Sequence, residues 1–140
     1  PPPRPDAAAL EERPRITLEM HVPGAEPNRY LHVTLIPNER YAMQWCVNAS
    51  REPCEESSRV NFALTDEQQF FLLLRDVRSM PRCEPLARMP GDRIFRLNIG
   101  GVQYEDGLPL VVQQIDTRSS QTCAKHLRMA AWIARRLGAM

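Results

Sequence analysis

The sequence predicts an α+β fold, in which a mostly antiparallel sheet of about six strands packs against two helices. Short segments of alternating apolar and polar residues fill the first half of the chain, as in strands with one buried face. Two longer segments carry apolar residues at helical spacing. Strands and helices do not alternate strictly, which argues against a parallel sheet.

The first four predicted strands follow one another closely. Residues 16–22 and 30–37 both alternate, and the turn residues of 23–28 between them predict an antiparallel hairpin. Residues 41–47 and 59–64 continue the pattern as a third and a fourth strand. These segments predict one connected antiparallel sheet.

Two helices complete the expected fold. The first runs from Thr65 to Pro81 and carries apolar residues at positions i, i+3, i+4 and i+7. The second begins at Ser119 or Ser120 and ends at about Leu137. The charged residues of the second helix are all basic, which fits complementation of the helix dipole and leaves contact with an acidic partner open.

Further strands are expected between the two helices. Residues 93–99 and 102–104 alternate and lead into the turn residues of 105–107. Residues 108–115 are then predicted to return as another strand. The double glycine in NIGGVQYEDG matches no phosphate-binding motif and is interpreted as a bulge or bend.

The N-terminal segment differs in composition from the rest of the chain. Residues 1–14 contain five prolines and a single large apolar side chain, which predicts a disordered Pro-rich linker. Residues 15–140 are expected to form a single α+β domain. A Pro-rich tether ahead of such a domain is typical of an exported chain, so we expect a periplasmic protein, with outer-membrane anchoring through a lipidated cysteine upstream of Pro1 as an option.

Cysteine spacing indicates what these residues do. None of them forms a C-x-x-C pair, and the three histidines add no paired ligand motif, so no metal ion and no cofactor are expected. An even number of cysteines in an exported chain favours two structural disulfides. The four cysteines can be paired in three ways, and we favour the pairs Cys46–Cys54 and Cys83–Cys123.

Two polar segments are the candidate binding surfaces. The first is the loop CVNASREPC, which a disulfide would stiffen, and a preorganised loop loses less entropy on binding. The second is the segment around the predicted turn at 105–107. The predicted partner-binding residues are Asn48, Ser50, Arg51 and Glu52 in the first, and Gln103, Tyr104, Glu105 and Asp106 in the second.

No catalytic constellation is found in the sequence. Cys123 and His126 could form a nucleophile and base, but Cys123 falls on the apolar stripe of its helix, where a structural role fits better. Glutamates on the polar loop are neighbours on one segment, which does not hold the separation that glycoside hydrolysis requires. The net charge of +1 provides no general attraction to nucleic acid. We therefore expect a binding protein and not an enzyme.

In its overall plan the chain resembles the periplasmic immunity lipoproteins that guard bacteria against type VI secreted cell-wall hydrolases. The shared features are the Pro-rich start, one folded domain, two expected disulfides and no active site. The resemblance implies an immunity or inhibitor protein that inserts polar loops into the active site of a toxic hydrolase such as an amidase or muramidase. The alternative is an outer-membrane lipoprotein that assists secretion-system assembly, like a pilotin, which would need a long apolar groove beside a helix.

Overall fold

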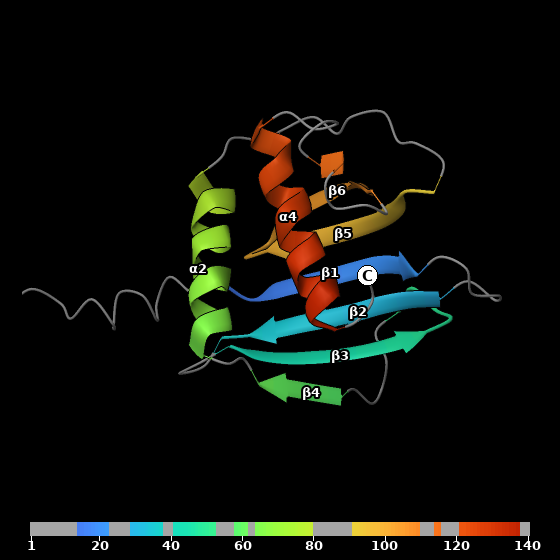
Figure 1. The fold of residues 1–140 in the computed structure, drawn as a ribbon. Helices are drawn as coiled ribbons and strands as arrows, with labels where there is room; N and C mark the ends of the chain where they lie inside the picture. Colours follow the sequence, from blue (N-terminus) through green and yellow to red (C-terminus); the bar gives the residue numbers. More distant parts are fainter. Residues whose placement is uncertain are drawn as a thin grey trace, which may run out of the picture.

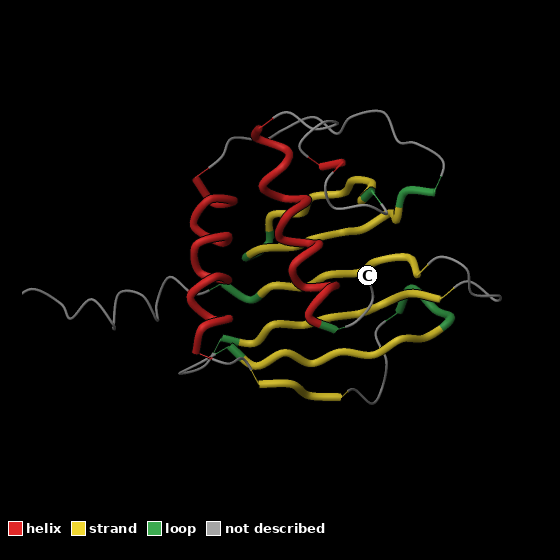
Figure 2. The backbone as a smooth tube through the Cα atoms, in the orientation of Figure 1, coloured by secondary structure: helices red, strands yellow, loops and turns green. Residues whose placement is uncertain are grey.

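The fold is a single antiparallel sheet with two helices on one of its faces (Figure 1). The tube trace of Figure 2 shows the same two layers. The α+β class is thus confirmed. This computed structural model describes residues 14–22, 29–37, 41–52, 58–61, 64–79, 91–109, 114–115 and 121–137. Within them, the side chains of 58–61, 64–66, 79 and 121–123 are not described.

Six strands and two helices have defined bounds in the described part of the chain. They are β1 (Ile16–Val22), β2 (Arg29–Ile36), β3 (Ala42–Asn48), β4 (Ser58–Asn61), α2 (Leu64–Ser79), β5 (Arg93–Ile99), β6 (Val102–Leu108) and α4 (Gln121–Arg136). The strands lie in the order β4-β3-β2-β1-β5-β6, and each neighbouring pair is antiparallel. Strand β1 therefore lies at the centre, between β2 and β5.

Alternation along the strands gives the sheet two different faces. Leu18 of β1 is 1% exposed and lies in register between Val33 of β2 and Leu97 of β5. Glu19, the next residue, points to the opposite face because successive side chains of a strand alternate. The result is an apolar face beneath the helices and a polar face on the other side.

Most of the predicted strands are confirmed within one or two residues. Their alternation carries enough apolar side chains on one face to specify both strand and register. These are the predicted segments 16–22, 30–37, 41–47 and 93–99. The first helix begins at Leu64, one residue earlier than predicted, and the second is described from Gln121.

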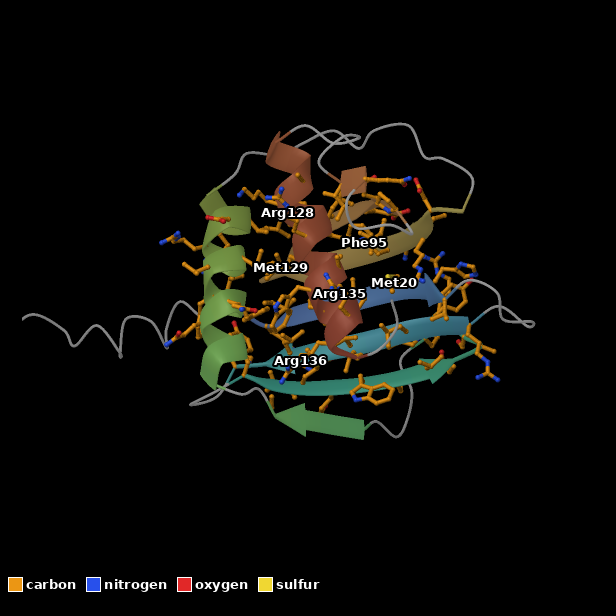
Figure 3. The ribbon with its side chains drawn as sticks, viewed as in Figure 1. Met20, Phe95, Arg128, Met129, Arg135 and Arg136 are labelled. Carbon is orange, nitrogen blue, oxygen red and sulfur yellow. The ribbon has the colours of Figure 1, made fainter. Side chains whose placement is uncertain are left out.

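Large side chains fill the space between the sheet and the helices. Met20 of β1, Phe95 of β5 and Met129 of α4 are fully buried in this layer (Figure 3). Phe70 of α2, also fully buried, has its ring centroid 5.4 Å from that of Trp132 in α4. The apolar stripes of both helices therefore form one core with the sheet.

The turn between β5 and β6 does not lie where the sequence predicted it. Gly100 and Gly101 form the turn and have φ values of +57° and +92°, a region that other residues rarely adopt. A Cβ on Gly100 would also approach the Cβ of Pro14 to 3.2 Å. The predicted turn at 105–107 is wrong, because these residues belong to β6 and pair with β5.

The strand predicted at 108–115 is also wrong. Strand β6 ends at Leu108, and Gln114 and Ile115 are helical. The Asp-Gly pair that was interpreted as a turn is accommodated within β6, where the side chain of Asp106 accepts a hydrogen bond of 2.7 Å from the N–H of Gly107. A turn-forming dipeptide can thus remain in a strand when a neighbouring pair of glycines provides the reversal.

Only the end of the predicted linker lies within the described residues. The carbonyl of Pro14 accepts a hydrogen bond of 2.6 Å from the hydroxyl of Tyr41, which is 1% exposed. Residues 1–13 lie outside the described part, so the predicted division into a linker and a single domain stays a prediction.

Candidate binding surface

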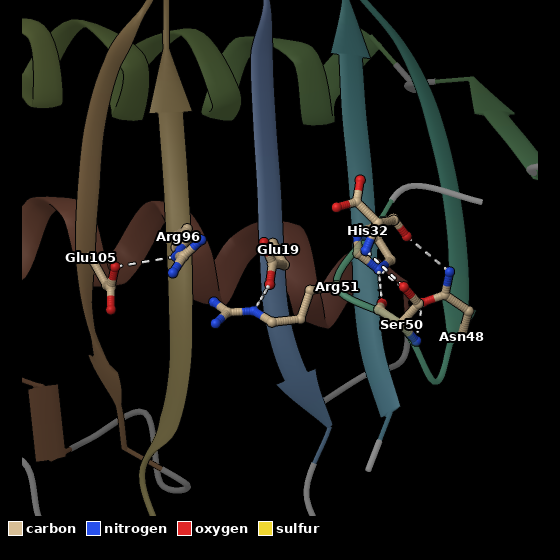
Figure 4. A network of polar contacts seen from close by, with 8 residues as sticks. Glu19, His32, Asn48, Ser50, Arg51, Arg96 and Glu105 are labelled. Carbon is tan, nitrogen blue, oxygen red and sulfur yellow. Dashed lines mark hydrogen bonds and ion pairs between the residues drawn. The ribbon is translucent and has the colours of Figure 1, made fainter. Parts of the chain in front are cut away.

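The candidate site is the face of the sheet that points away from α2 and α4, which we call the open face. Figure 4 shows it with both helices behind the strands. Register aligns one residue from each of five strands across this face, and we call this line the charged row. Its members are Glu105, Arg96, Glu19, His32 and Cys46.

A second line of polar side chains runs beside the charged row. It contains amides and hydroxyls and no charged group among its five members. They are Gln103, Asn98, Thr17, Thr34 and Gln44. Together the two rows give the open face many hydrogen-bonding groups. Such a surface suits a polar protein interface better than a lipid or an apolar ligand.

Positive and negative groups are paired along the charged row. Arg51, from the loop after β3, donates from Nε to Oε1 of Glu19 at 2.8 Å. Arg96 donates from Nε to Oε2 of Glu105 at 3.2 Å (Figure 4). The hydrogen bond and the charge of Glu19 raise the pKa of the Arg51 guanidinium above its ordinary value. Exposed pairs contribute little to stability, so their main effect is to orient these side chains.

The loop that carries Arg51 is held against the sheet by His32 of β2. Nε2 of His32 lies 2.9 Å from Oδ1 of Asn48 and 2.8 Å from the carbonyl oxygen of Ser50. Both neighbours are acceptors, so Nε2 carries the hydrogen and donates. Asn48 in turn donates from Nδ2 to the carbonyl of Glu52 at 3.0 Å. Residues 48–52 are thus fixed by side-chain hydrogen bonds.

We expect the variant His32→Ala to release this loop while the sheet stays folded. The amides of Ser50 and Glu52 donate to side chains within the loop, and both bonds depend on the position that His32 stabilises. Hydrogen–deuterium exchange of residues 49–52 should become about tenfold faster, in line with the loss of one net hydrogen bond. Thr34→Ala, on the same strand and face, is the control. Unchanged exchange in His32→Ala would show that the loop is held by other contacts.

Two small hollows flank Arg51 on the open face. One, of about 210 Å³, also involves His21 and Tyr30. The other, of about 290 Å³, extends toward the second line of polar side chains and is lined there by Thr17, Thr34, Asn98 and Gln103. Both are lined by Glu19, Arg51 and Arg96. Their volumes lie at or below the lower end of the usual range of small-molecule sites, about 300 Å³, and suit single side chains of a protein partner.

The predicted loop residues are found on this surface, and so are two of the four residues predicted on the second segment. Gln103 and Glu105 belong to the open face. Tyr104 and Asp106 point the other way, because neighbours on a strand alternate. The ring of Tyr104 lies 4.0 Å from that of His126 in α4. The prediction that Tyr104 is exposed on a protruding turn is therefore wrong.

Sequence reasoning missed the residues that position the loop. Glu19, His32 and Arg96 were not among the predicted binding residues. The available signal was their alternation, which places all three on the face opposite the core. The contacts of Glu19 with Arg51, of His32 with Asn48 and of Arg96 with Glu105 depend on the order of the strands in the sheet, which alternation does not reveal.

Cys46 in the charged row is disulfide-bonded. Its partner is one of three cysteines whose side chains lie outside the described part, namely Cys54, Cys83 and Cys123. The pairs Cys46–Cys54 and Cys83–Cys123 therefore stay predictions. Among the described residues no group of three histidine, cysteine, aspartate or glutamate side chains could hold a metal ion.

Comparison with known proteins adds no assignment. The chain matches no protein-family model and no curated protein sequence. No helix in the described ranges has the length and apolar character needed to cross a membrane. Function is accordingly inferred from the surface of this chain.

Proposed function

We propose that this protein is a non-enzymatic periplasmic binding protein that inhibits a toxic cell-wall hydrolase. The observation that supports it best is Arg51, which the loop 48–52 holds over Glu19 near the centre of the open face. An arginine oriented before binding loses little side-chain entropy when a partner docks. Arginine is also among the residues that most often dominate protein interfaces.

The composition of the charged row supports binding and not catalysis. Both carboxylates, Glu19 and Glu105, are engaged by guanidinium groups. Cys46 of the charged row is in a disulfide, so its sulfur is not available as a thiolate nucleophile. The two hollows beside Arg51, of about 210 and 290 Å³, have volumes that suit a side chain of a protein partner.

Two disulfides with the pairs Cys46–Cys54 and Cys83–Cys123 belong to this proposal. The first pair would close the loop that carries Arg51 and add to the stiffness that His32 provides. Peptide mapping under non-reducing conditions tests the pairing, because each bond links two defined peptides. A link from Cys46 to either distant cysteine would contradict it.

The test of the proposed function is inhibition of a cell-wall hydrolase. Immobilised protein is incubated with periplasmic extract of the source organism, and the retained proteins are identified and purified. Any retained hydrolase is then assayed by dye release from labelled peptidoglycan with increasing amounts of this protein. We expect its activity to fall in a stoichiometric titration. Retention without loss of activity, or no retained hydrolase, would overturn the inhibitor proposal.

The pilotin-like alternative is kept as an outcome of the same experiment. It predicts a long apolar groove beside a helix, and a groove of about 600 Å³ does lie between α2 and α4. Three arginines line this groove, so it is not the apolar channel that the alternative requires. Recovery of an outer-membrane assembly subunit in place of a hydrolase would nevertheless favour the alternative.

A further inference from the structure

The helix layer carries a groove whose chemistry differs from that of the open face. We call it the helix groove. It has a volume of about 600 Å³ and lies between α2 and α4, on the side of the molecule opposite the charged row. Its lining residues are Gln69 and Leu73 from α2 and Arg128, Ala131, Trp132, Arg135 and Arg136 from α4.

The helix groove combines apolar side chains with a basic rim. Leu73 and Trp132 are both partly buried, so they offer apolar surface that is incompletely covered by the fold. Arg135 and Arg136 are exposed at the end of α4 (Figure 3). The sequence of α4 contains no acidic residue.

The facing helix α2 has two acidic residues whose side chains are described, the buried Glu67 and the partly buried Asp76. Asp76 of α2 lies 3.5 Å from Nζ of Lys125 and 3.9 Å from Arg75. The groove itself is lined by three arginines and no carboxylate. The open face, in contrast, balances two arginines with two glutamates in ion pairs. The lining of the helix groove is therefore basic in composition, whereas the two arginines of the open face are matched by two glutamates.

We propose that the helix groove binds an acidic, amphipathic peptide segment of a partner protein. Its apolar side chains would lie on Trp132 and Leu73, and its carboxylates would pair with Arg135 and Arg136. The arginines of the lining favour an acidic ligand by charge complementarity. The concave shape between the two helices favours a peptide segment that can enter the groove. This site is separate from the open face and does not depend on the proposed inhibition.

The dimensions of the groove suit a short helical segment. Its lining on α4 extends from Arg128 to Arg136, which corresponds to about 12 Å along the helix axis. A segment of about two helical turns matches this length. Trp132 and Leu73 are partly buried in a hollow between two helices, which a peptide segment can enter more readily than a flat anionic membrane can, so a peptide is favoured over lipid.

The probe for the experiment is a fluorescein-labelled amphipathic peptide with leucines on one helical face and glutamates elsewhere. Its binding is measured by fluorescence anisotropy with the intact chain and with the variant Arg135→Gln/Arg136→Gln. The matched control is Arg75→Gln/Arg78→Gln, which removes the same charge from the end of α2 but lies outside the groove lining. Thermal melts check that each variant is folded.

We expect the Arg135→Gln/Arg136→Gln variant to bind the peptide about tenfold more weakly than the wild type, since two partly exposed ion pairs are lost. The Arg75→Gln/Arg78→Gln control should bind within about twofold of the wild type. If both variants bound the peptide equally weakly, the proposed site would be overturned, because the peptide would then be attracted by the overall positive charge of the chain. The chain could instead bind vesicles rich in phosphatidylglycerol through the same arginines and fail to bind the peptide. This result would overturn the proposed peptide ligand and favour a lipid.

Discussion

Replacement of Phe70 with alanine is expected to lower the free energy of unfolding by about 3–5 kcal/mol. The side chain is 0% exposed, so the change removes buried apolar surface and leaves a cavity. A domain of this kind is stabilised by about 5–15 kcal/mol in total. A single substitution on α2 should therefore remove at least about a fifth of the stability, and most of it if the domain is only marginally stable.

The size of this effect follows from the position of Phe70 between three parts of the fold. Its ring centroid lies 5.1 Å from that of Tyr41, just before β3, and 5.4 Å from that of Trp132 in α4. Phe71, its neighbour on α2, also contacts Tyr41, at 5.9 Å. Loss of the Phe70 ring thus weakens contacts of both helices with the sheet, and rearrangement of one neighbour cannot fill the space.

The matched control is Leu72→Ala on the same helix. Leu72 is 53% exposed, so its truncation should change the free energy of unfolding by less than about 0.5 kcal/mol. Urea denaturation followed by circular dichroism measures both variants. Similar losses for Phe70→Ala and Leu72→Ala would mean that α2 is not held to the sheet by this aromatic cluster.

How far the sequence predicts the fold depends on whether the pattern is local. In β1 the alternation from Ile16 to Val22 lies within one strand, and it correctly assigns the buried and polar faces. The stripe of α2 is equally local, and Phe70, Leu74 and Val77 are buried as expected. Both patterns are strong because each strand or helix must bury its own apolar face.

The β5–β6 hairpin shows where local patterns compete. The Asp106-Gly107 pair is a strong turn signal, and the Gly100-Gly101 pair was interpreted as a bend. The structure places the turn at the two glycines, where Asn98 accepts a hydrogen bond of 2.9 Å from the N–H of Gly101. Propensity did not separate the two sites. Pairing of β5 along the full length of β6 decides between them, and this is a tertiary contact.

Only part of the candidate surface was predicted, because some of its residues are brought together by tertiary contacts. The polar composition of the loop indicated Arg51 and Asn48, because loops with polar residues often carry binding groups. Glu19 and His32 lie far from the loop in the sequence, and only the sheet order brings β1 and β2 beneath it. Composition therefore identified the presented residues, and the residues that orient them required the structure.

The variant Arg51→Ala is expected to weaken binding of the inhibited hydrolase by roughly thirtyfold or more, as for a central interface arginine. This expectation depends on the proposed function. Arg51 contributes to both hollows of the open face, and its guanidinium carbon lies 5.9 Å from the centroid of the Tyr30 ring. Because the Arg51 side chain is 51% exposed, its loss should leave the melting temperature nearly unchanged.

Two further variants separate a specific role of Arg51 from general charge. Arg51→Lys keeps the charge but not the planar guanidinium, and should recover only part of the affinity. Arg75→Ala removes an arginine that is 73% exposed on α2 and should leave inhibition unchanged. Inhibition titrations of the hydrolase measure all three. Full affinity in Arg51→Ala would mean that the partner docks elsewhere, whereas equal losses in Arg51→Ala and Arg75→Ala would indicate attraction by net charge and not by the open face.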